Sequence, residues 1–461
     1  MPLVLGVDSS TQSTKAVLVD ADDGTVVDQA SARHPEGTAV DPRAWLAAFD
    51  EAAGPLLPRA AAVSVAGQQH GMVALDDAGH PVHDALLWND TRSAEAATQL
   101  IEEMGGAGAC AREVGSVLVA SFTVTKLRWL RDHAPRAAAA VRRVLLPHDY
   151  VSWHLAGRPG EPFTDHGDAS GTGYYSPAAR AWRPDLAASA LGHDVALPRI
   201  VEPGEEAGRT PDGVLVAAGT GDNMAAALGL GLADGDLALS IGTSGVASGV
   251  SVTAPDDATG AVTGFADATG NFLPMATTLN AARILDLQCR LLGVDHDELA
   301  RLALSAEPGA GGLTLLPYYA GERTPNRPAA LGTWHGLRPE TTRADVARAA
   351  VEALLCSLAD ALDAVVAQTG GAVERVLLTG GGARNDAVRA LAAGIVGHPL
   401  TRLDDGEHVA LGAARQAAWT LSGSATPPAW PVTVRETLTG PPDSSVREAY
   451  AQLRDRTRSW S

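Results

Sequence analysis

The sequence predicts an α/β protein of two domains, on three observations. The chain has 461 residues, more than one ordinary hydrophobic core organises. Strand-like and helix-like segments alternate in both halves of the chain, as in α/β proteins. A strand, a turn of small residues and a second strand occur twice, at residues 3–20 and 237–250. Glycines and Asp234 interrupt the pattern before the second copy, so we expect an N-terminal domain at 1–234 and a C-terminal domain at 235–461.

The elements of the N-terminal half follow from local patterns. Apolar residues predict strands at 3–7, 15–20 and 25–29, separated by a small polar turn at 8–14 and by Asp22, Asp23 and Gly24. Helical periodicity is found at 43–57, 93–104 and 125–133, and buried strands are expected at 61–66 and 144–146.

The C-terminal half repeats the alternation. Strands are expected at 237–241, 246–250 and 375–378 and near Leu400, and helices at 280–292, at 342–368, from Asn385 and after His408. Residues 427–442, which contain several prolines, are predicted to form a loop.

Composition excludes several classes of partner. The formal net charge of -19 repels nucleic acid and anionic membranes. Cys110, Cys289 and Cys356 are too few and too widely spaced for a disulfide framework or a zinc site, which favours a reducing cytoplasm. The chain shows no signal-peptide pattern, and acidic residues interrupt its longest membrane-span candidate, at 228–250. We expect a cytoplasmic protein whose ligands are small molecules.

Three runs of small residues are candidate phosphate loops. The first, at 8–15, offers hydroxyls and backbone amides between two strands, with Asp8 available to a magnesium ion. Its Lys15 is one of only two lysines in a chain rich in arginine. Because an ammonium is more compact than a guanidinium and is hydrated differently, a lysine here favours a phosphate-binding role for the turn. The runs at 242–245 and 380–385 have the same character. Each alone is equally compatible with a simple tight turn.

The segment 219–224 follows a buried strand and opens a helix. It resembles a dinucleotide-binding fingerprint, but Met224 occupies the third glycine position and no acidic partner follows at the required spacing. Asp222 stands at the carboxyl end of the strand, where open α/β sheets place reactive groups. An aspartate that caps the helix is the alternative.

Two further segments carry groups suited to a polyhydroxylated ligand. Gln69 and His70 follow a buried strand, and Trp88, Asp90 and Arg92 come soon after. Amide, imidazole, carboxylate and guanidinium groups with an indole face can bind hydroxyls. Neither His70 nor the pair His148 and His154 has the spacing of metal ligands.

Taken in order, these segments resemble the FGGY carbohydrate kinases, and within them the xylulokinases. The matching motifs are the Asp8 turn, GQQHG at 67–71, LWNDTR at 87–92, LLPHDY at 145–150, TDHGDASGT at 164–172, GTGDN at 219–223, SIGTSG at 240–245, GERTP at 321–325 and TGGGARN at 379–385. The resemblance covers nearly the whole chain. It implies two RNase H-like domains of the actin-like ATPase type, with ATP and Mg²⁺ in a cleft between them.

The resemblance also implies roles for individual residues. Asp222 would be the catalytic base, and Asp8 and Asp222 would face the metal. The sugar would be bound by Gln69, His70, Trp88, Asp90, Asp222 and Asn223. ATP would be bound by Ser10, Thr11, Gln12, Lys15, Gly242, Thr243, Ser244, Gly381, Gly382 and Asn385. Ser10 replaces a usual glycine, and Gln69 stands where many relatives have methionine.

The implied activity is ATP-dependent phosphorylation of D-xylulose to D-xylulose 5-phosphate in pentose catabolism, by a soluble enzyme for which a homodimer is the expected assembly. Kinases of the same fold that act on ribulose, gluconate or glycerol are the nearest alternative. A non-catalytic actin-like protein that binds ATP or sugar is a second. A sugar-responsive repressor would need DNA-binding helices before Leu3, and an NAD-dependent oxidoreductase is disfavoured by Met224.

Overall fold

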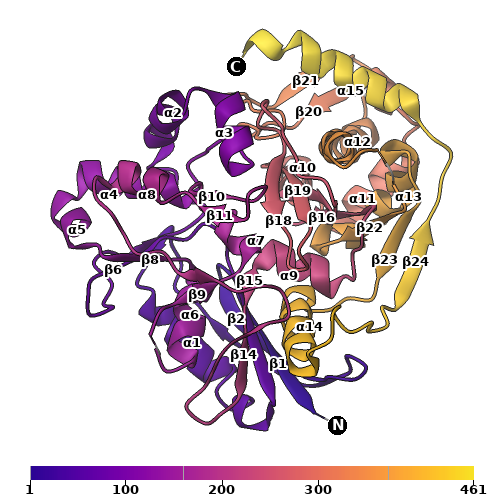
Figure 1. Cartoon of the computed structure of the whole chain (residues 1–461). Coiled ribbons are helices and arrows are strands. Elements are labelled where there is room, and N and C mark those ends of the chain that lie inside the picture. Colours follow the sequence, from indigo (N-terminus) through magenta and orange to yellow (C-terminus); the bar gives the residue numbers. More distant parts are fainter. Residues whose placement is uncertain (1, 159, 372, 461) are drawn as a thin grey trace. The chain divides into compact units, whose positions relative to one another are not determined.

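The computed structural model describes residues 2–158, 160–371 and 373–460, which fall into two compact units. Unit 1 comprises Met1–Leu232, Val252–Leu273 and Asp405–Val432. Unit 2 comprises Ala233–Ser251, Pro274–Asp404 and Thr433–Ser461. Each unit is built on a mixed sheet with helices packed against it (Figure 1). Domain limits at residues 234 and 235 remain a prediction.

The sheet of unit 1 has the strand order β13-β14-β5-β1-β2-β3. Its strands are β1 (Leu3–Ser9), β2 (Ser13–Asp20), β3 (Val26–Arg33), β5 (Ala62–Gly67), β13 (Glu206–Arg209) and β14 (Leu215–Ala217), and the short β15 (Thr220–Gly221) also pairs with β5. The β1–β2 and β2–β3 pairs are antiparallel, whereas β1–β5 and β5–β14 are parallel. The carboxyl ends of β1, β5 and β15 therefore lie side by side.

Both faces of this sheet are buried, which explains why its central strands are apolar without interruption. On one face, Leu5 and Val7 pack in a core with Trp45 and Phe49 of α1 (Arg43–Ala52). On the other, a second core joins Val4, Val17 and Ala62 to Ala410 and Ala414 of α14 (His408–Ser422).

Helix α14 lies unusually close to the sheet and to α9 (Asp222–Gly229), and two glycines permit this. A Cβ atom on Gly6 would lie 2.0 Å from the carbonyl oxygen of Ala410. A Cβ atom on Gly412 would lie 1.8 Å from the carbonyl oxygen of Ala225. No side chain fits at either position. A helix from the C-terminal part of the chain is thereby fixed behind the strands of unit 1.

Further elements complete unit 1 around this sheet. The helices are η1 (Leu57–Arg59), α2 (Ala94–Glu103), α3 (Ala107–Val114), α4 (Thr123–His133), α5 (Pro135–Ala140), α6 (Pro147–Leu155), α7 (His166–Ala169) and α8 (Pro184–Leu191). The short strands are β4 (Ala39–Val40), β6 (Val73–Leu75), β7 (Ala85–Leu86), β8 (Arg143–Leu145), β9 (Phe163–Thr164), β10 (Tyr175–Ser176), β11 (Ala181–Trp182), β12 (Arg199–Ile200) and β18 (Thr263–Ala266).

The main strands of unit 2 follow the order β19-β17-β16-β22-β23-β24. They are β16 (Asp236–Ile241), β17 (Gly245–Gly249), β19 (Phe272–Thr278), β22 (Arg375–Thr379), β23 (Leu400–Leu403) and β24 (Val434–Leu438). The other elements are α10 (Ala282–Leu292), α11 (His296–Ser305), η2 (Ala310–Gly312), β20 (Thr314–Leu316), β21 (Thr333–His335), α12 (Arg343–Gln368), η3 (Gly381–Arg384), α13 (Asp386–Val396), α15 (Ser444–Arg456) and η4 (Arg458–Trp460).

The two sheets share one topology. In unit 2 the β16–β17 and β17–β19 pairs are antiparallel, and the β16–β22 and β22–β23 pairs are parallel, as in β1, β2, β3, β5 and β14 of unit 1. An antiparallel edge strand, β13 or β24, closes each set. The strand-turn-strand pattern that occurs twice in the sequence thus corresponds to β1–β2 in unit 1 and to β16–β17 in unit 2, which are equivalent hairpins of the two sheets.

Two local predictions need correction. Residues 427–442 were expected to form a loop, but β24 lies within them and pairs with β23. The hydrophobic pattern of a strand is absent from 434–438 because this edge strand is largely exposed. An ion pair between Arg402 and Glu436, which face each other across β23 and β24, stabilises the pairing. The helix expected at 43–57 ends at Ala52, before Gly54 and Pro55 interrupt it.

In the part of the chain that the structure describes, no helix combines the length and apolar character needed to cross a membrane.

Candidate active site

Asp8 stands at the end of β1, beside the turn that leads into β2. It is 3% exposed, and its strand partner across the hairpin is Lys15. The Ser10 hydroxyl donates a hydrogen bond to Oδ1 of Asp8. Burial raises the pKa of Asp8 to about 6, although the Ser10 hydrogen bond and the Lys15 charge act in the opposite direction. Ser10 therefore contacts the carboxylate that is expected to face the metal.

Lys15 has a partner that the sequence did not indicate. Its Nζ lies 2.6 Å from Oε2 of Glu407, and both side chains are partly exposed. Glu407 directly precedes α14. Because α14 packs against β1 in unit 1, an acidic residue from far along the chain is placed beside the first phosphate-loop candidate.

Asp222 is the first residue of α9 and directly follows β15. Its Oδ1 accepts hydrogen bonds from the backbone N–H and the side-chain Nδ2 of Asn223, at 2.8 and 3.0 Å. Gly221, not Asp222, occupies the N-cap position. Burial, reinforced by the negative charges of Asp8 and Asp168, raises the pKa of Asp222 to about 8. Such a carboxylate has a stronger affinity for a proton than an ordinary aspartate.

Gln69 connects the GQQHG segment to Asp222. Asn223 Nδ2 donates to Oε1 of Gln69 at 2.8 Å, so one amide bridges Gln69 and the Asp222 carboxylate. Gln69 is 3% exposed, and its Nε2 has no hydrogen-bond partner among the described residues. An unpaired buried donor is costly unless a ligand satisfies it. The amide is therefore suited to a polar ligand beside Asp222.

His70 is held from several directions. Its backbone has φ of 67°, a strained conformation for a residue with a side chain. Thr123 Oγ1 and Lys126 Nζ donate to its carbonyl oxygen at 3.1 and 2.6 Å. Its Nδ1 lies 2.6 Å from the carbonyl oxygen of Gly171. A carbonyl only accepts, so Nδ1 carries the proton and a neutral ring has Nε2 as its acceptor nitrogen.

The LWNDTR segment meets the first phosphate-loop candidate directly. Trp88 Nε1 donates to Oγ1 of Thr11 at 2.9 Å, and 40% of Trp88 is exposed. Asp90 accepts from Thr38 Oγ1 at 2.8 Å and from Arg92 Nε at 2.8 Å. Burial by itself raises the pKa of Asp90, but the Arg92 and Thr38 hydrogen bonds outweigh it and the pKa is lowered. Trp88 is thus open to ligand, whereas Asp90 chiefly organises its own loop.

The remaining residues of the first loop, Ser10 and Gln12, lie in the same turn. Ser10 N donates to the carbonyl oxygen of Ser13 at 3.1 Å, and the carbonyl oxygen of Gln12 accepts from His34 N at 2.8 Å. These bonds fix the backbone of the turn between β1 and β2.

Unit 2 brings its two glycine-containing loops together. Gly242, Thr243 and Ser244 form the turn between β16 and β17, in which Gly242 and Thr243 are exposed and Ser244 is half-buried. Gly380 has φ of 86°, and a Cβ atom there would lie 2.6 Å from the carbonyl oxygen of Ile241. The turn with Gly381 and Gly382 therefore begins against the residue that precedes Gly242. Asn385 caps α13 by accepting from the N–H groups of Ala387 and Val388 at 3.0 and 3.2 Å.

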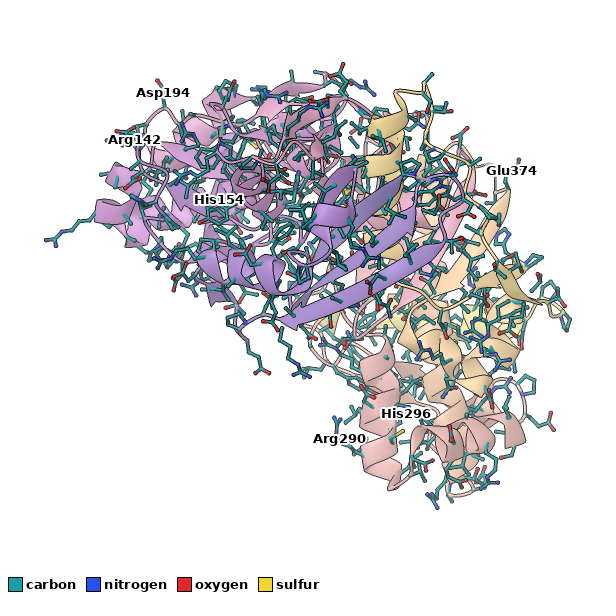
Figure 2. All side chains as sticks on the ribbon, turned by 90° about the horizontal axis from the view of Figure 1, so that it is seen from below. Arg142, His154, Asp194, Arg290, His296 and Glu374 are labelled. Carbon is teal, nitrogen blue, oxygen red and sulfur yellow. The ribbon has the colours of Figure 1, made fainter. Side chains whose placement is uncertain are left out.

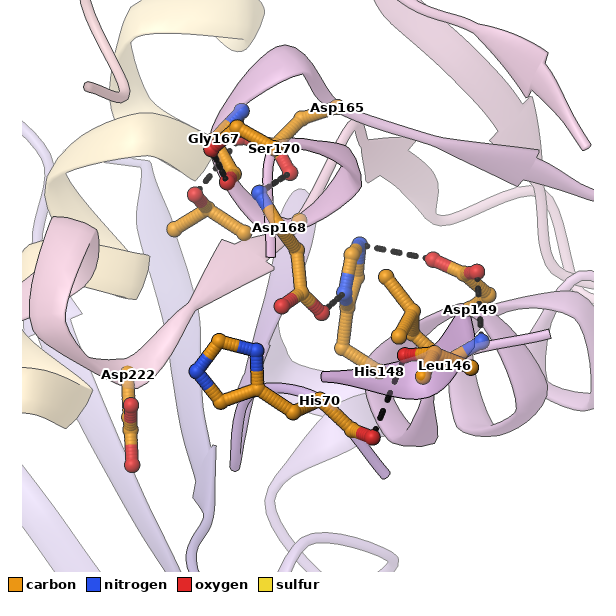
Figure 3. Close-up of polar contacts among 12 residues, drawn as sticks. His70, Leu146, His148, Asp149, Asp165, Gly167, Asp168, Ser170 and Asp222 are labelled. Atoms are coloured by element: carbon orange, nitrogen blue, oxygen red, sulfur yellow. Dashed lines mark hydrogen bonds and ion pairs between the residues drawn. The ribbon is translucent and has the colours of Figure 1, made fainter. Parts of the chain in front are cut away.

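The structure contains a buried ionic cluster in unit 1, formed by His148, Asp149 and Asp168, that the sequence analysis did not predict. His148 lies between two carboxylates, with Nδ1 2.6 Å from Asp168 Oδ2 and Nε2 3.3 Å from Asp149 Oδ1 (Figure 3). All three are fully buried. Two of the matching motifs, LLPHDY and TDHGDASGT, supply these residues, so the signal lay in two segments that only the fold brings together.

His148, Asp149 and Asp168 are also the chemical types that bind metal ions, and their candidate ligand atoms lie within 4.8 Å of one another. The imidazole is already engaged with carboxylates on both sides. His154, which is labelled in Figure 2, belongs to the same helix α6. Its Nδ1 bonds the carbonyl oxygen of Tyr150 at 2.8 Å. We therefore describe the cluster as an ion-pair chain.

The fold and this site define a class: a kinase-like protein of two α/β units of the actin-like ATPase type. Models of the FGGY family of carbohydrate kinases match the chain twice, the N-terminal domain over residues 3–231 and the C-terminal domain over residues 237–421. The chain therefore belongs to the FGGY family of carbohydrate kinases. The two-domain fold class expected from the motifs is confirmed, and membership implies ATP as the phosphoryl donor.

Individual relatives are similar over nearly their whole length. The chain is 48% identical to the xylulose kinase of Streptomyces coelicolor, over 92% of this chain and 89% of that protein. It is 47% identical to the xylulose kinase of Streptomyces rubiginosus, with the same coverage. The crystal structure of xylulose kinase from Bifidobacterium adolescentis superposes with a TM-score of 0.92 at 45% identity, covering 98% of this chain and 99% of that one.

Proposed function

We propose that this protein transfers the terminal phosphoryl group of ATP to the terminal hydroxyl of D-xylulose, forming D-xylulose 5-phosphate. The relatives named xylulose kinase support the choice of sugar. The observation that carries the proposal is the amide of Asn223, which bonds both the Asp222 carboxylate and Gln69. It joins the proton acceptor to the segment expected to bind sugar.

Asp222 would accept the proton of the attacking hydroxyl. Phosphoryl transfer depends mainly on positioning and on neutralising charge, and a carboxylate base acts once the alcohol begins to bond to phosphorus. The raised pKa of about 8 brings the proton affinity of Asp222 closer to that needed in the transition state. The base must be ionised to act, so binding of cationic groups nearby would favour its active form.

The sugar would lie against the groups that converge on Asp222. Gln69 offers its unpaired Nε2 as a donor. His70, fixed through its carbonyl and Nδ1, would accept a hydrogen bond from a sugar hydroxyl through Nε2. Asn223 would orient the hydroxyl beside the base, and the exposed indole of Trp88 would cover an apolar edge of the sugar. Asp90 would support this site by holding its loop.

The carboxylates of Asp8 and Asp222 fit a hard divalent cation. Asp8 is buried at a strand end, and its negative charge helps to raise the pKa of Asp222. A cation between the two carboxylates would therefore stabilise the ionised form of both. Carboxylate oxygens are the ligands that Mg²⁺ prefers. We propose that Asp8 and Asp222 hold Mg²⁺ directly or through its waters. When bound, this ion would neutralise phosphate charge.

The nucleotide would be bound by the three small-residue loops. Ser10, Thr11, Gln12 and Lys15 would contact the transferring phosphoryl group from unit 1. Gly242, Thr243 and Ser244 of unit 2 would bind phosphate oxygens through backbone amides and hydroxyls, as such turns do. Gly381, Gly382 and Asn385 would bind adenosine, because glycines permit close approach of a flat base. A cytoplasmic location and a homodimer remain parts of the proposal.

ADP release measured by a coupled assay over D-xylulose, ribulose, gluconate and glycerol tests the sugar assignment. We expect the highest kcat/KM with D-xylulose, and a clear preference for another acceptor would reassign the substrate. The Asp222→Asn variant tests the base, since it keeps the size of the side chain. Its kcat should fall about 100-fold or more while sugar and nucleotide still bind. An intact Asp222→Asn protein with normal kcat would remove Asp222 from that role.

A further inference from the structure

The segment that leads to Asp222, residues 219–221, contains two glycines and therefore has few side chains that could fix its position. Gly219 has φ of 76°, and a Cβ atom there would lie 2.6 Å from Cδ2 of His148. A Cβ atom on Gly221 would lie 2.8 Å from Cγ of Gln69. Neither position can carry a side chain without displacing a neighbour. Thr220 is therefore the residue of 219–221 whose own side chain can anchor the segment. From outside the segment, Gln416 Nε2 of α14 donates to the carbonyl oxygen of Gly219 at 3.1 Å.

The Thr220 hydroxyl has a fixed partner. It donates to Oδ2 of Asp165 at 2.6 Å, and both residues are buried. The Asp165 carboxylate is itself held by the start of α7: Oδ2 accepts from Gly167 N and Oδ1 from Asp168 N, each at 2.9 Å (Figure 3). A hydrogen bond to a charged acceptor that cannot rotate away is both strong and directional.

The strand pairing next to this bond is short. β15 pairs with β5 only through Thr220 opposite Ala66 and Gly221 opposite Gly67. The next residue is Asp222, which begins α9. A reacting group displaced by about 1 Å can lose 100-fold in rate, so this short segment needs support beyond two strand pairs.

We propose that Thr220 and Asp165 are positioning residues that hold Asp222 in the geometry of proton transfer. This inference rests on the proposed function and deepens it. Sugar binding should depend on the bond far less than proton transfer does, because Gln69 and His70 belong to the segment after β5, and His70 is fixed separately, through Gly171, Thr123 and Lys126. Loss of the Thr220 hydroxyl should therefore reduce turnover and leave sugar affinity almost unchanged.

Substitution of Thr220 by residues of graded donor strength tests the inference. Thr220→Val keeps the shape but has no donor, and its kcat should fall about 10-fold or more. Thr220→Ser keeps the hydroxyl and should stay within about 3-fold of wild type, and Thr220→Cys, a weak donor, should fall between them. Calorimetry should give D-xylulose affinities within about 2-fold of wild type for all three.

Thr210→Val is the matched control, because Thr210 is a buried threonine of unit 1 whose hydroxyl accepts from Val214 N at 3.1 Å. It should have wild-type kcat. Equal losses in the Val and Ser variants, or wild-type kcat in Thr220→Val, would overturn the inference. Asp222→Asn, assayed alongside, distinguishes the positioning role of Thr220 from the base role of Asp222. If Asp222→Asn is inactive and Thr220→Val is fully active, only the positioning role is rejected. If Asp222→Asn is active, the role of Asp222 as the base is rejected.

Discussion

Lys15 of β2 and Glu407, which precedes α14, form an ion pair with Nζ and Oε2 2.6 Å apart, although 392 positions separate them in the chain. Lys15 is the ammonium that we assign to the transferring phosphoryl group. In the structure, its charge is shared with a carboxylate. ATP therefore competes with Glu407 for Lys15, or Glu407 keeps Lys15 aimed at the phosphates.

Glu407→Gln distinguishes these two roles of the ion pair. If Glu407 competes with ATP, the variant should lower KM for ATP about 2- to 5-fold, the size expected for an exposed pair. The effect should shrink in high salt, because exposed charges are screened. Steady-state kinetics at two ionic strengths measures it, with Glu51→Gln, at an exposed site of α1, as a control for loss of an acidic residue. A raised KM would show that Glu407 orients Lys15.

Ser10→Ala tests the consequence of a serine beside Asp8. The Ser10 hydroxyl donates to Asp8 Oδ1, so it occupies an oxygen that we assign to Mg²⁺ or its waters. Its removal should lower the Mg²⁺ concentration for half-maximal activity about 2- to 10-fold, the effect of one hydrogen bond. A Mg²⁺ titration at saturating ATP and sugar measures this. Ser13→Ala, at the start of β2, is the control. A higher Mg²⁺ requirement for Ser10→Ala would show that its hydroxyl supports the bound ion and does not compete with it.

Gln69→Met tests the unpaired amide. Methionine fills similar space but offers neither the Nε2 donor nor the acceptor for Asn223. D-xylulose affinity should fall by about 1–3 kcal/mol, because a sugar oxygen loses its donor in a buried site. Isothermal calorimetry with the sugar alone gives the value directly. Gln99→Met on the exposed face of α2 is the control, and unchanged affinity in Gln69→Met would place the sugar away from this amide.

The His148 cluster predicts how stability depends on pH. Burial alone lowers the pKa of His148, but the Asp149 and Asp168 carboxylates outweigh it and raise it to about 9. Burial raises the pKa of Asp149 to about 7 and of Asp168 to about 6. Each shift makes the folded state bind protons more tightly than the unfolded state, so each contribution to stability is lost as pH rises from the ordinary pKa through the folded one. The contributions of Asp168 and Asp149 are lost above pH 3.8, through about 6 and about 7, and that of His148 is lost between pH 6.5 and about 9.

Differential scanning fluorimetry between pH 6 and pH 9.5 measures this loss as a falling Tm. His148→Gln removes the group that titrates highest, so the fall in Tm between pH 7.5 and pH 9.5 should be smaller in the variant. His133→Gln, at an exposed site, should behave as wild type. A Tm that rises over this interval in wild type would contradict the assigned charges of the cluster.

Much of the fold was readable in the sequence because local patterns matched the global architecture. The runs at 3–7 and 61–66 predicted central strands, since a sheet buried on both faces needs continuous apolar residues. The two strand-turn-strand patterns marked equivalent strands in two sheets of one topology. Edge strand β24 was missed because an exposed strand held by ion pairs has no apolar alternation to detect.

By itself, the sequence determined the two α/β halves and the segments that carry Asp8, Gln69, His70 and Asp222, because those segments are short and their chemistry is local. Only the tertiary structure decided which distant residues adjoin them. It placed Glu407 beside Lys15, joined Asp168 to His148, and tied Thr220 to Asp165. These contacts depend on how helices pack and where loops return, and packing at that scale leaves no periodic trace in the chain.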